Sequence, residues 1–329
     1  SQVAISVDAP GKVNLYLAVG DVRPDGYHPL TTLFAAVSLT ETITVSKGQV
    51  PGLSLSMDIV PGSLVDQQMQ AGQFDPAAVP MDERNLVYRA AALILAEHGI
   101  ETVPALHLHI AKAVPVAGGM AGGSADAAAA LIATDRYLHA TGCTGALLTQ
   151  TDYERLAAQL GADIPFSARA ALGQTFALGQ GTGTELQNVE APPESLHLVI
   201  VAAQFGLATP SVFKQLDAGR AAGEYPASGE LVEPVELLEA LNSYDGSEAA
   251  LASLAPLLRN DLQAPALSCA PQLEQTLNLR DSEGVYASLV SGSGPTVLLL
   301  VSSQARAEAL ASALRATGNH AVATKVTSA

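Results

Sequence analysis

Hydrophobic and polar residues change their spacing several times along the chain, and each change predicts a new element. In the first third, apolar residues often recur at every second position, which is typical of strands. These strands are predicted at residues 3–8, 13–19, 42–46, 53–59 and 106–111. Residues 61–84 are polar and have no period, so an exposed, mobile insertion is predicted there. A helical period follows at residues 85–98, with the apolar residues on one face.

The rest of the chain alternates between strands and helices. The alanines after Ser124 predict a strong helix, with Ser124 or Asp126 near its N-cap. Further helices are predicted at 152–160 (capped by Thr151 or Asp152), 234–244, 247–258, 271–279 and 304–317, strands at 171–178, 197–203, 285–289, 296–301 and 322–326, and a loop at 219–234. Hairpin-like strands near the start and a strand–turn–strand–helix–strand ending predict an α+β fold rather than a doubly wound sheet.

Composition narrows the class of protein. The chain has 329 residues, of which 48% are apolar, so we expect about two domains with sizeable cores and no global disorder. Apolar runs stay below the ~18 residues of a membrane-spanning helix, and residues 1–10 lack a signal-peptide pattern, so a cytoplasmic protein is expected. Cys143 and Cys269 fit neither a disulfide framework nor a zinc site, and we expect two buried thiols.

The charge balance is strongly acidic. Sixteen basic and 32 acidic residues give a net charge of −16. Without a basic excess to neutralise backbone phosphates, nucleic acid is not an expected partner. The lysines are few enough to list: Lys12, Lys47, Lys112, Lys214 and Lys325. A lysine inside a motif is therefore informative.

The most informative segment is a glycine loop between a predicted strand and a predicted helix. Gly118, Gly119, Gly122 and Gly123 precede Ser124. Glycines let the backbone come close to a ligand, and the start of a helix offers free N–H groups with a partial positive charge. The segment therefore predicts an anion site suited to phosphates. The alternative is a tight strand-to-helix turn without a ligand.

Two common phosphate loops do not fit this segment. A P-loop ends in Gly-Lys-Ser/Thr, and here no lysine follows the glycines. The dinucleotide fingerprint G-x-G-x-x-G is also absent from the loop. A second glycine group, at Gly179, Gly181 and Gly183, leads to no helix and predicts a turn.

Five segments, in the same order along the chain, resemble the GHMP kinases, a superfamily of small-molecule kinases. PVAGGMAGGSADAA (115–128) resembles their ATP-binding motif. APGKVNLYLAVGDVRPDGYHPLTTLF (9–34), LGADIPF (160–166), ATPSVFK (208–214) and SGSGPTVLLL (291–300) are similar to the branch that phosphorylates the 2-hydroxyl of 4-diphosphocytidyl-2-C-methyl-D-erythritol in non-mevalonate isoprenoid biosynthesis. Alanine at 117, 121 and 125 departs from the usual glycine- and serine-rich loop, and the 61–84 insertion is longer than usual.

This resemblance implies a two-domain fold with mixed or antiparallel sheets, packed helices and an active site in the cleft between the domains. An N-terminal domain at 1–185 and a C-terminal domain at 186–329 are expected. The resemblance implies that Asp163 is the catalytic base and that Lys12 works beside it. An adjacent lysine keeps a carboxylate charged and stabilises the transferring phosphoryl group.

ATP is the implied co-substrate. The residues implied for it are Pro115, Val116, Ala117, Gly118, Gly119, Met120, Ala121, Gly122, Gly123, Ser124 and Ala125 at the phosphates, with Asn85 and Lys112 on the adenine side. Magnesium is expected because kinases use it to bridge phosphates. Ser124 is a candidate ligand, with capping of the helix as its alternative role, and the magnesium ligands stay unknown.

For the acceptor, the resemblance implies that Asn14 contacts the erythritol hydroxyls. Tyr27 and Phe213 would enclose the cytosine, while His28 and Lys214 would contact its edge. Three alternatives stay open: another GHMP kinase of homoserine or mevalonate type, a dinucleotide-dependent oxidoreductase, and a non-enzymatic nucleotide-binding module. The expected partners are ATP and the cytidine diphosphate substrate, with no nucleic acid and no membrane; the oligomeric state is undetermined.

Overall fold

The computed structural model describes residues 2–116 and 118–327. The chain forms two compact units, each built from segments that are far apart in sequence. The first unit comprises Ser1–Gly11, Leu39–Val116 and Ala121–Gln174, and the second comprises Lys12–Ser38, Ala117–Met120 and Thr175–Ala329. Since the units alternate along the chain, the sequence division into 1–185 and 186–329 stays a prediction.

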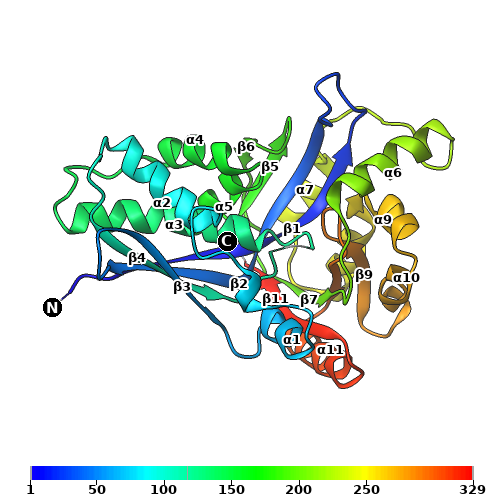
Figure 1. Cartoon of the computed structure of the whole chain (residues 1–329). Helices are drawn as coiled ribbons and strands as arrows, with labels where there is room; N and C mark the ends of the chain where they lie inside the picture. Colours follow the sequence, from blue (N-terminus) through cyan, green and yellow to red (C-terminus); the bar gives the residue numbers. More distant parts are fainter. Residues whose placement is uncertain (1, 117, 328–329) are drawn as a thin grey trace. The chain divides into compact units, whose positions relative to one another are not determined.

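The strands carry the labels of Figure 1. They are β1 (Ile5–Val19), β2 (Leu30–Lys47), β3 (Gly52–Ile59), β4 (Ala105–Lys112), β5 (Phe176–Gln180), β6 (Glu185–Asn188), β7 (Leu196–Ala202), β8 (Arg259–Asn260), β9 (Val285–Val290), β10 (Val297–Val301) and β11 (His320–Val326). Parallel and antiparallel pairs both occur, because β3 runs parallel to β4 whereas β7, β9, β10 and β11 pair antiparallel. The predicted α+β class with mixed sheets is confirmed.

The helices lie between these strands in sequence. They are α1 (Leu64–Gln70), α2 (Leu86–Glu97), α3 (Gly122–Ala140), α4 (Gln150–Leu160), α5 (Ile164–Ala171), α6 (Thr209–Ala221), α7 (Val235–Asn242), α8 (Glu248–Leu254), α9 (Gln263–Cys269), α10 (Leu273–Leu277) and α11 (Gln304–Ala316), with short 3₁₀ turns η1 (Pro76–Ala78), η2 (Ala255–Leu257) and η3 (Asn278–Asp281). No helix of the described residues is long and apolar enough to cross a membrane.

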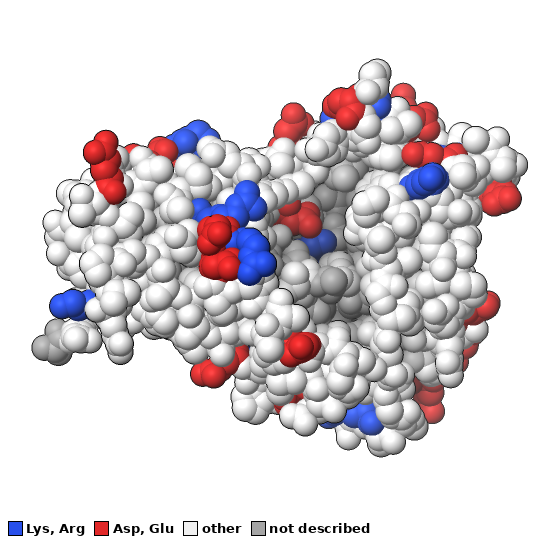
Figure 2. Space-filling view, in the orientation of Figure 1, with Lys and Arg blue, Asp and Glu red and all other residues white. Residues whose placement is uncertain are grey.

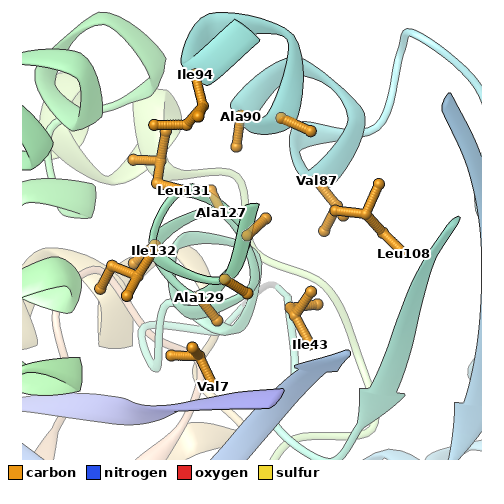
Figure 3. Packing of buried hydrophobic residues seen from close by; sticks show 14 of the residues in the cluster. Val7, Ile43, Val87, Ala90, Ile94, Leu108, Ala127, Ala129, Leu131 and Ile132 are labelled. Carbon is orange, nitrogen blue, oxygen red and sulfur yellow. The ribbon is translucent and has the colours of Figure 1, made fainter. Parts of the chain in front are cut away.

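In the first unit, helices α2 to α5 lie on one side of the strands (Figure 1). Helix α3 lies at the centre of the core, and its alanines from Ala125 to Ala133 are fully buried. Figure 3 shows Ala127, Ala129 and Ile132 of α3 among apolar side chains of α2 and the strands. Small side chains let neighbouring elements approach α3 closely, so this helix is held firmly at the point where it follows the glycine loop.

The second unit has its own core. Apolar residues of β7, β9 and β10 pack with residues of α6, α9, α10 and α11. Asn260, at the end of β8, donates from Nδ2 to the carbonyls of Val290 (2.8 Å) and Gly292 (2.7 Å). Its Oδ1 accepts the N–H of Leu262 at 2.9 Å. The turn after β9 is therefore fixed to the core by one buried amide.

Several predictions of local structure are wrong. The segment at 61–84 contains α1 and η1, and α1 is capped by Ser63, whose hydroxyl accepts the N–H of Asp66. Residues 171–178 are the end of α5 and the start of β5 rather than one strand, while α6 and α9 were not predicted. Thr149, rather than Thr151 or Asp152, caps α4. Cys143 and Cys269 are exposed rather than buried.

Candidate active site

Lys12 and Asn14 lie two positions apart on β1, so their side chains share one face of the strand. Both are buried, and Lys12 Nζ donates to Asn14 Oδ1 at 2.6 Å. Asn14 Nδ2 donates to Thr32 Oγ1 at 2.8 Å, and this hydroxyl donates in turn to the carbonyl of Tyr16 at 2.7 Å. Because the single hydroxyl proton of Thr32 is used, Thr32 accepts from Asn14 and turns the amide oxygen towards Lys12.

The glycine-loop residues 118–120 pack against the turn that follows β9. Their carbonyls accept hydrogen bonds from Thr296 N (3.1 Å), Ser291 Oγ (3.0 Å) and Lys12 N (3.1 Å), in that order. A Cβ placed on Gly292 would lie 3.5 Å from Asn14 Oδ1 and 3.8 Å from Lys12 Nζ. The second unit therefore brings three sequence motifs together: the Lys-x-Asn pair, part of the glycine loop and the C-terminal glycine motif.

Two of these glycines are required by the backbone. Gly118 and Gly119 have φ values of 105° and 97°, which side chains disfavour. A Cβ on Gly118 would lie 2.6 Å from Thr296 Oγ1, and a Cβ on Gly119 would lie 2.0 Å from the carbonyl oxygen of Ser291. The backbone of Gly118 and Gly119 therefore lies too close to the turn at Ser291 and Thr296 to leave room for a side chain.

In the first unit, the other part of the loop forms the start of α3. Ala121 adopts the left-handed conformation (φ 57°), and the N–H of Gly122 donates to the carbonyl of Pro115 at 3.1 Å. Among the described residues, the next two N–H groups, of Gly123 and Ser124, have no acceptor. No side chain caps the helix, so the prediction that Ser124 or Asp126 caps it is wrong. Unpaired donors at a helix start are suited to a phosphate.

Asp163 occupies the N-cap position of α5. Its backbone is helical and its side chain makes no capping hydrogen bond. The carboxylate, which is partly exposed, has no hydrogen-bond or ion-pair partner within the part of the chain that the structure describes. Asp163 belongs to the first unit and Lys12 to the second, and their cooperation stays a prediction.

On the predicted substrate side, His28 and Phe213 come together. Their ring centroids are 4.8 Å apart, with an interplanar angle of 42°. His28 Nε2 lies 2.8 Å from Asp217 Oδ1, one helical turn after Phe213 on α6. Since a carboxylate oxygen accepts, Nε2 carries a proton and the tautomer of neutral His28 is fixed.

Tyr27 and Lys214 are exposed, Tyr27 to 64%. Tyr27 follows Gly26, whose φ is 85°, in a turn before β2. The N–H of Tyr27 donates to Asp25 Oδ1 at 2.9 Å, and this bond lowers the pKa of Asp25 below its usual value. The turn therefore presents the Tyr27 ring to solvent, where a ligand can reach it.

The two residues predicted for the adenine side are engaged by the chain itself. Asn85 is the N-cap of α2, where its Oδ1 accepts from Val87 N and its Nδ2 donates to the Pro80 carbonyl, both at 2.9 Å. Lys112 is buried between two carboxylates. These contacts give no support to a role in ATP binding, which stays a prediction for both. Ala117, also predicted for ATP, lies outside the described residues.

Sequence reasoning missed the partners of the predicted residues. Thr32 orients Asn14, Asp217 orients His28, and Ser291 and Thr296 hold the glycine loop. The last two lie inside a segment that the resemblance had marked, so the motif was a signal for them. Thr32 likewise lies inside the marked segment 9–34, but nothing in the sequence pairs it with Asn14, and no marked segment includes Asp217.

The described residues contain no group of three or more His, Cys, Asp or Glu side chains that could hold a metal ion. On the face shown in Figure 2, basic side chains lie apart from one another or beside acidic ones. Positive charge is therefore not gathered into a broad patch on this face.

Comparison with known proteins agrees with these motifs. The family model "GHMP kinases N terminal domain" matches residues 85–171, and "GHMP kinases C terminal" matches residues 236–320. Together they define a GHMP kinase. A crystal structure of 4-(cytidine 5'-diphospho)-2C-methyl-D-erythritol kinase aligns with a TM-score of 0.74 and 29% identity, covering 99% of this chain and 100% of that chain.

Curated relatives give the finer assignment. The 4-diphosphocytidyl-2-C-methyl-D-erythritol kinase of Pseudarthrobacter chlorophenolicus is 41% identical over 321 residues, covering 97% of this chain and 91% of the relative. The enzyme of the same name from Mycobacterium avium is 44% identical over 304 residues, covering 92% and 84%. The chain therefore belongs to the GHMP kinases, in the family of the 4-diphosphocytidyl-2-C-methyl-D-erythritol kinases. The predicted kinase class is confirmed, and the oxidoreductase and the non-enzymatic module are excluded.

Proposed function

We propose that this chain transfers the γ-phosphoryl group of ATP to the 2-hydroxyl of 4-diphosphocytidyl-2-C-methyl-D-erythritol, giving the 2-phosphate and ADP in isoprenoid precursor biosynthesis. The observation that carries the proposal is the 41–44% identity, over nearly the whole chain, to relatives with this name. A homoserine kinase from Cytophaga hutchinsonii has a TM-score of 0.65 at 17% identity, which supports a shared fold and not a shared substrate. Because ATP is a cytoplasmic metabolite, the reaction is assigned to the cytoplasm.

Each predicted residue has a role that its surroundings permit. Asp163 receives the proton of the acceptor hydroxyl, for which a carboxylate without a partner among the described residues is suited. Lys12 places its charge on the transferring phosphoryl group. Asn14, whose orientation Thr32 fixes, contacts the acceptor hydroxyls. His28 and Phe213 contact the cytosine, and Tyr27 covers it from the exposed turn.

The glycine loop receives the phosphates of ATP. The N–H groups of Gly123 and Ser124 fit a phosphate because they lack acceptors in the described chain and lie at the N-terminus of α3. Magnesium fits the same place. It binds mainly through substrate phosphates and water and needs only one or two protein ligands. The Ser124 hydroxyl, which caps no helix residue, would be one of them. When bound, magnesium neutralises charge on the phosphates.

An ADP-release assay with the cytidine diphosphate substrate tests the proposal. The wild-type chain should turn over this acceptor and neither homoserine nor mevalonate. Asp163→Asn should lower kcat by about 10²–10⁴-fold, the usual contribution of a general base, while the dissociation constant for ATP stays within about 2-fold. A wild-type chain that binds ATP and leaves this acceptor unphosphorylated would sink the proposal.

A further inference from the structure

A buried cluster of three charged side chains joins the segment before the glycine loop to the helix after it. Lys112 Nζ donates to Glu41 Oε1 at 2.7 Å and to Asp126 Oδ2 at 2.9 Å. All three residues are at most 7% exposed, and all belong to the first unit. We call Glu41, Lys112 and Asp126 the anchor cluster.

The anchor cluster grips the chain on both sides of the loop. Lys112 is the last residue of β4, and the next two N–H groups, of Ala113 and Val114, donate to Glu41 Oε2 (2.9 Å) and Oε1 (3.1 Å). On the other side, Asp126 lies in the first turns of α3, two residues after Ser124. The Glu41 carboxylate thus binds the segment before the loop. The Lys112 ammonium, which contacts both Glu41 and Asp126, links that segment to α3 after the loop.

The backbone at this place is packed too tightly to tolerate a shift. A Cβ on Gly122 would lie 2.3 Å from the Val114 carbonyl oxygen and 2.5 Å from that of Pro115. The entering segment and the start of α3 therefore touch through their backbones. If Glu41 released Val114, the contact that positions the first turn of α3 would change with it.

The charges of the cluster are not balanced, since two carboxylates share one ammonium. Burial, followed by the charge of Asp126, raises the pKa of Glu41 to about 7. Burial also raises the pKa of Asp126, and its Oδ1 has no hydrogen-bond partner within residues 2–116 and 118–327. Because desolvation offsets most of the attraction within a buried ion pair, these charges add little stability of their own. This imbalance, together with the backbone contacts, indicates a role beyond filling the core.

We propose that the anchor cluster is a positioning device for ATP: Glu41, through Lys112 and Asp126, fixes the N–H groups at the start of α3 that receive the phosphates. This inference rests on the proposed function. Glu41 acts through the backbone and does not touch the nucleotide. Its loss should therefore weaken ATP binding far more than acceptor binding.

The first unit offers a matched control. Asp135 is also a fully buried carboxylate. It accepts hydrogen bonds from the N–H of Leu148 (2.8 Å) and the hydroxyl of Tyr153 (2.5 Å), and its Oδ1 lies 2.6 Å from His98 Nε2. It lies towards the far end of α3 from the loop. Glu41→Gln and Asp135→Asn each replace a buried carboxylate by an amide and should both lower the melting temperature.

The experiment compares the full chain and the two variants in three measurements. Calorimetry gives the dissociation constant for a non-hydrolysable ATP analogue without acceptor, steady-state kinetics give kcat and both KM values, and thermal melting gives stability. For Glu41→Gln we expect the dissociation constant and the KM for ATP to rise at least 10-fold, with the KM for the acceptor within 2-fold. For Asp135→Asn we expect both KM values within 2-fold despite a comparable loss of stability.

The inference is overturned if Glu41→Gln loses stability but keeps its affinity for the analogue, or if both variants lose affinity in proportion to stability. Should Glu41→Gln fail to fold, Glu41→Asp keeps the charge and draws the carboxylate back from Ala113 and Val114; a rise of about 3-fold or more in the same dissociation constant is then required. Because analogue binding needs no acceptor, a wild-type chain that binds the analogue but does not phosphorylate the acceptor refutes only the proposed function.

Discussion

Replacing Gly119 by alanine tests whether the glycine loop depends on its backbone contact with the C-terminal turn. The new Cβ would lie 2.0 Å from the carbonyl oxygen of Ser291 and 2.9 Å from its carbonyl carbon. Both neighbours are backbone atoms, so no side chain can rotate away. The Ser291 hydroxyl, which donates to the Gly119 carbonyl at 3.0 Å, would lose its acceptor as the two segments separate.

The expected destabilisation has two parts. A side chain at the positive φ of Gly119 costs roughly 1–2 kcal/mol. Overpacking that forces a backbone shift costs roughly 1–3 kcal/mol more. A total of about 3 kcal/mol lowers the melting temperature of a large domain by roughly 6–12 °C. The KM for ATP should also rise by about 10-fold, because the shifted loop no longer presents its N–H groups correctly.

Thermal melting and ATP kinetics measure the two effects, and Gly123→Ala is the matched control for the melting temperature. A Cβ on Gly123 would meet its nearest neighbours at 3.4 Å and 3.8 Å, the side chains of Val116 and Leu86, which is ordinary contact. Since alanine favours a helix over glycine by about 1 kcal/mol, this variant should melt at or slightly above the wild-type temperature. If Gly119→Ala melts at the wild-type temperature, the reasoning is refuted.

Three further predictions concern the buried polar groups. The free energy of unfolding should fall as pH rises from about 4.5 to about 7, because burial raises the pKa of Glu41 to about 7. In this range the folded chain holds a proton that the unfolded chain has released. Urea unfolding at pH 5 and pH 8 should show this loss of stability, and Glu41→Gln should make the loss smaller. Thr32→Val removes the acceptor of Asn14 and should lower kcat by about 10-fold, with a stability loss of about 1–3 kcal/mol; an unchanged kcat contradicts the role of Asn14. Asp217→Asn replaces the charged acceptor of His28 by a neutral one and so weakens one charge-assisted hydrogen bond. The KM for the cytidine substrate should rise by about 5-fold, and the KM for ATP should stay unchanged.

Sequence patterns located the elements with a clear period. The predicted helices at 85–98 and 304–317 agree with α2 and α11 to within one residue at each end, since apolar spacing and caps at Asn85 and Ser303 act locally. Helix α6 was missed because its polar and small residues give no strong apolar face, and its helical state depends on packing against α9. Ser63 is a favoured N-cap residue, but α1 was not predicted because the segment 61–84 is polar and has no apolar period.

For the site, the sequence marked motifs and not the contacts between them. The resemblance supplied Lys12, Asn14 and the glycine loop, but nothing local indicates that Thr32 turns the amide of Asn14. The resemblance also implied that Lys112 lies on the adenine side of ATP. Only the structure shows that two carboxylates already surround its ammonium.

That use of Lys112 changes how an acidic chain can bind a triphosphate. Lys112 is neutralised within the anchor cluster, whereas the buried Lys12 donates to the neutral amide of Asn14. The remaining attraction for phosphate comes from N–H groups at the start of α3, whose partial charges depend on direction. Dipoles must be held in place to act, whereas a mobile lysine can follow its ligand. A loop with few cations therefore needs rigid ends, and the anchor cluster and the turn at Ser291 and Thr296 supply them, one in each unit.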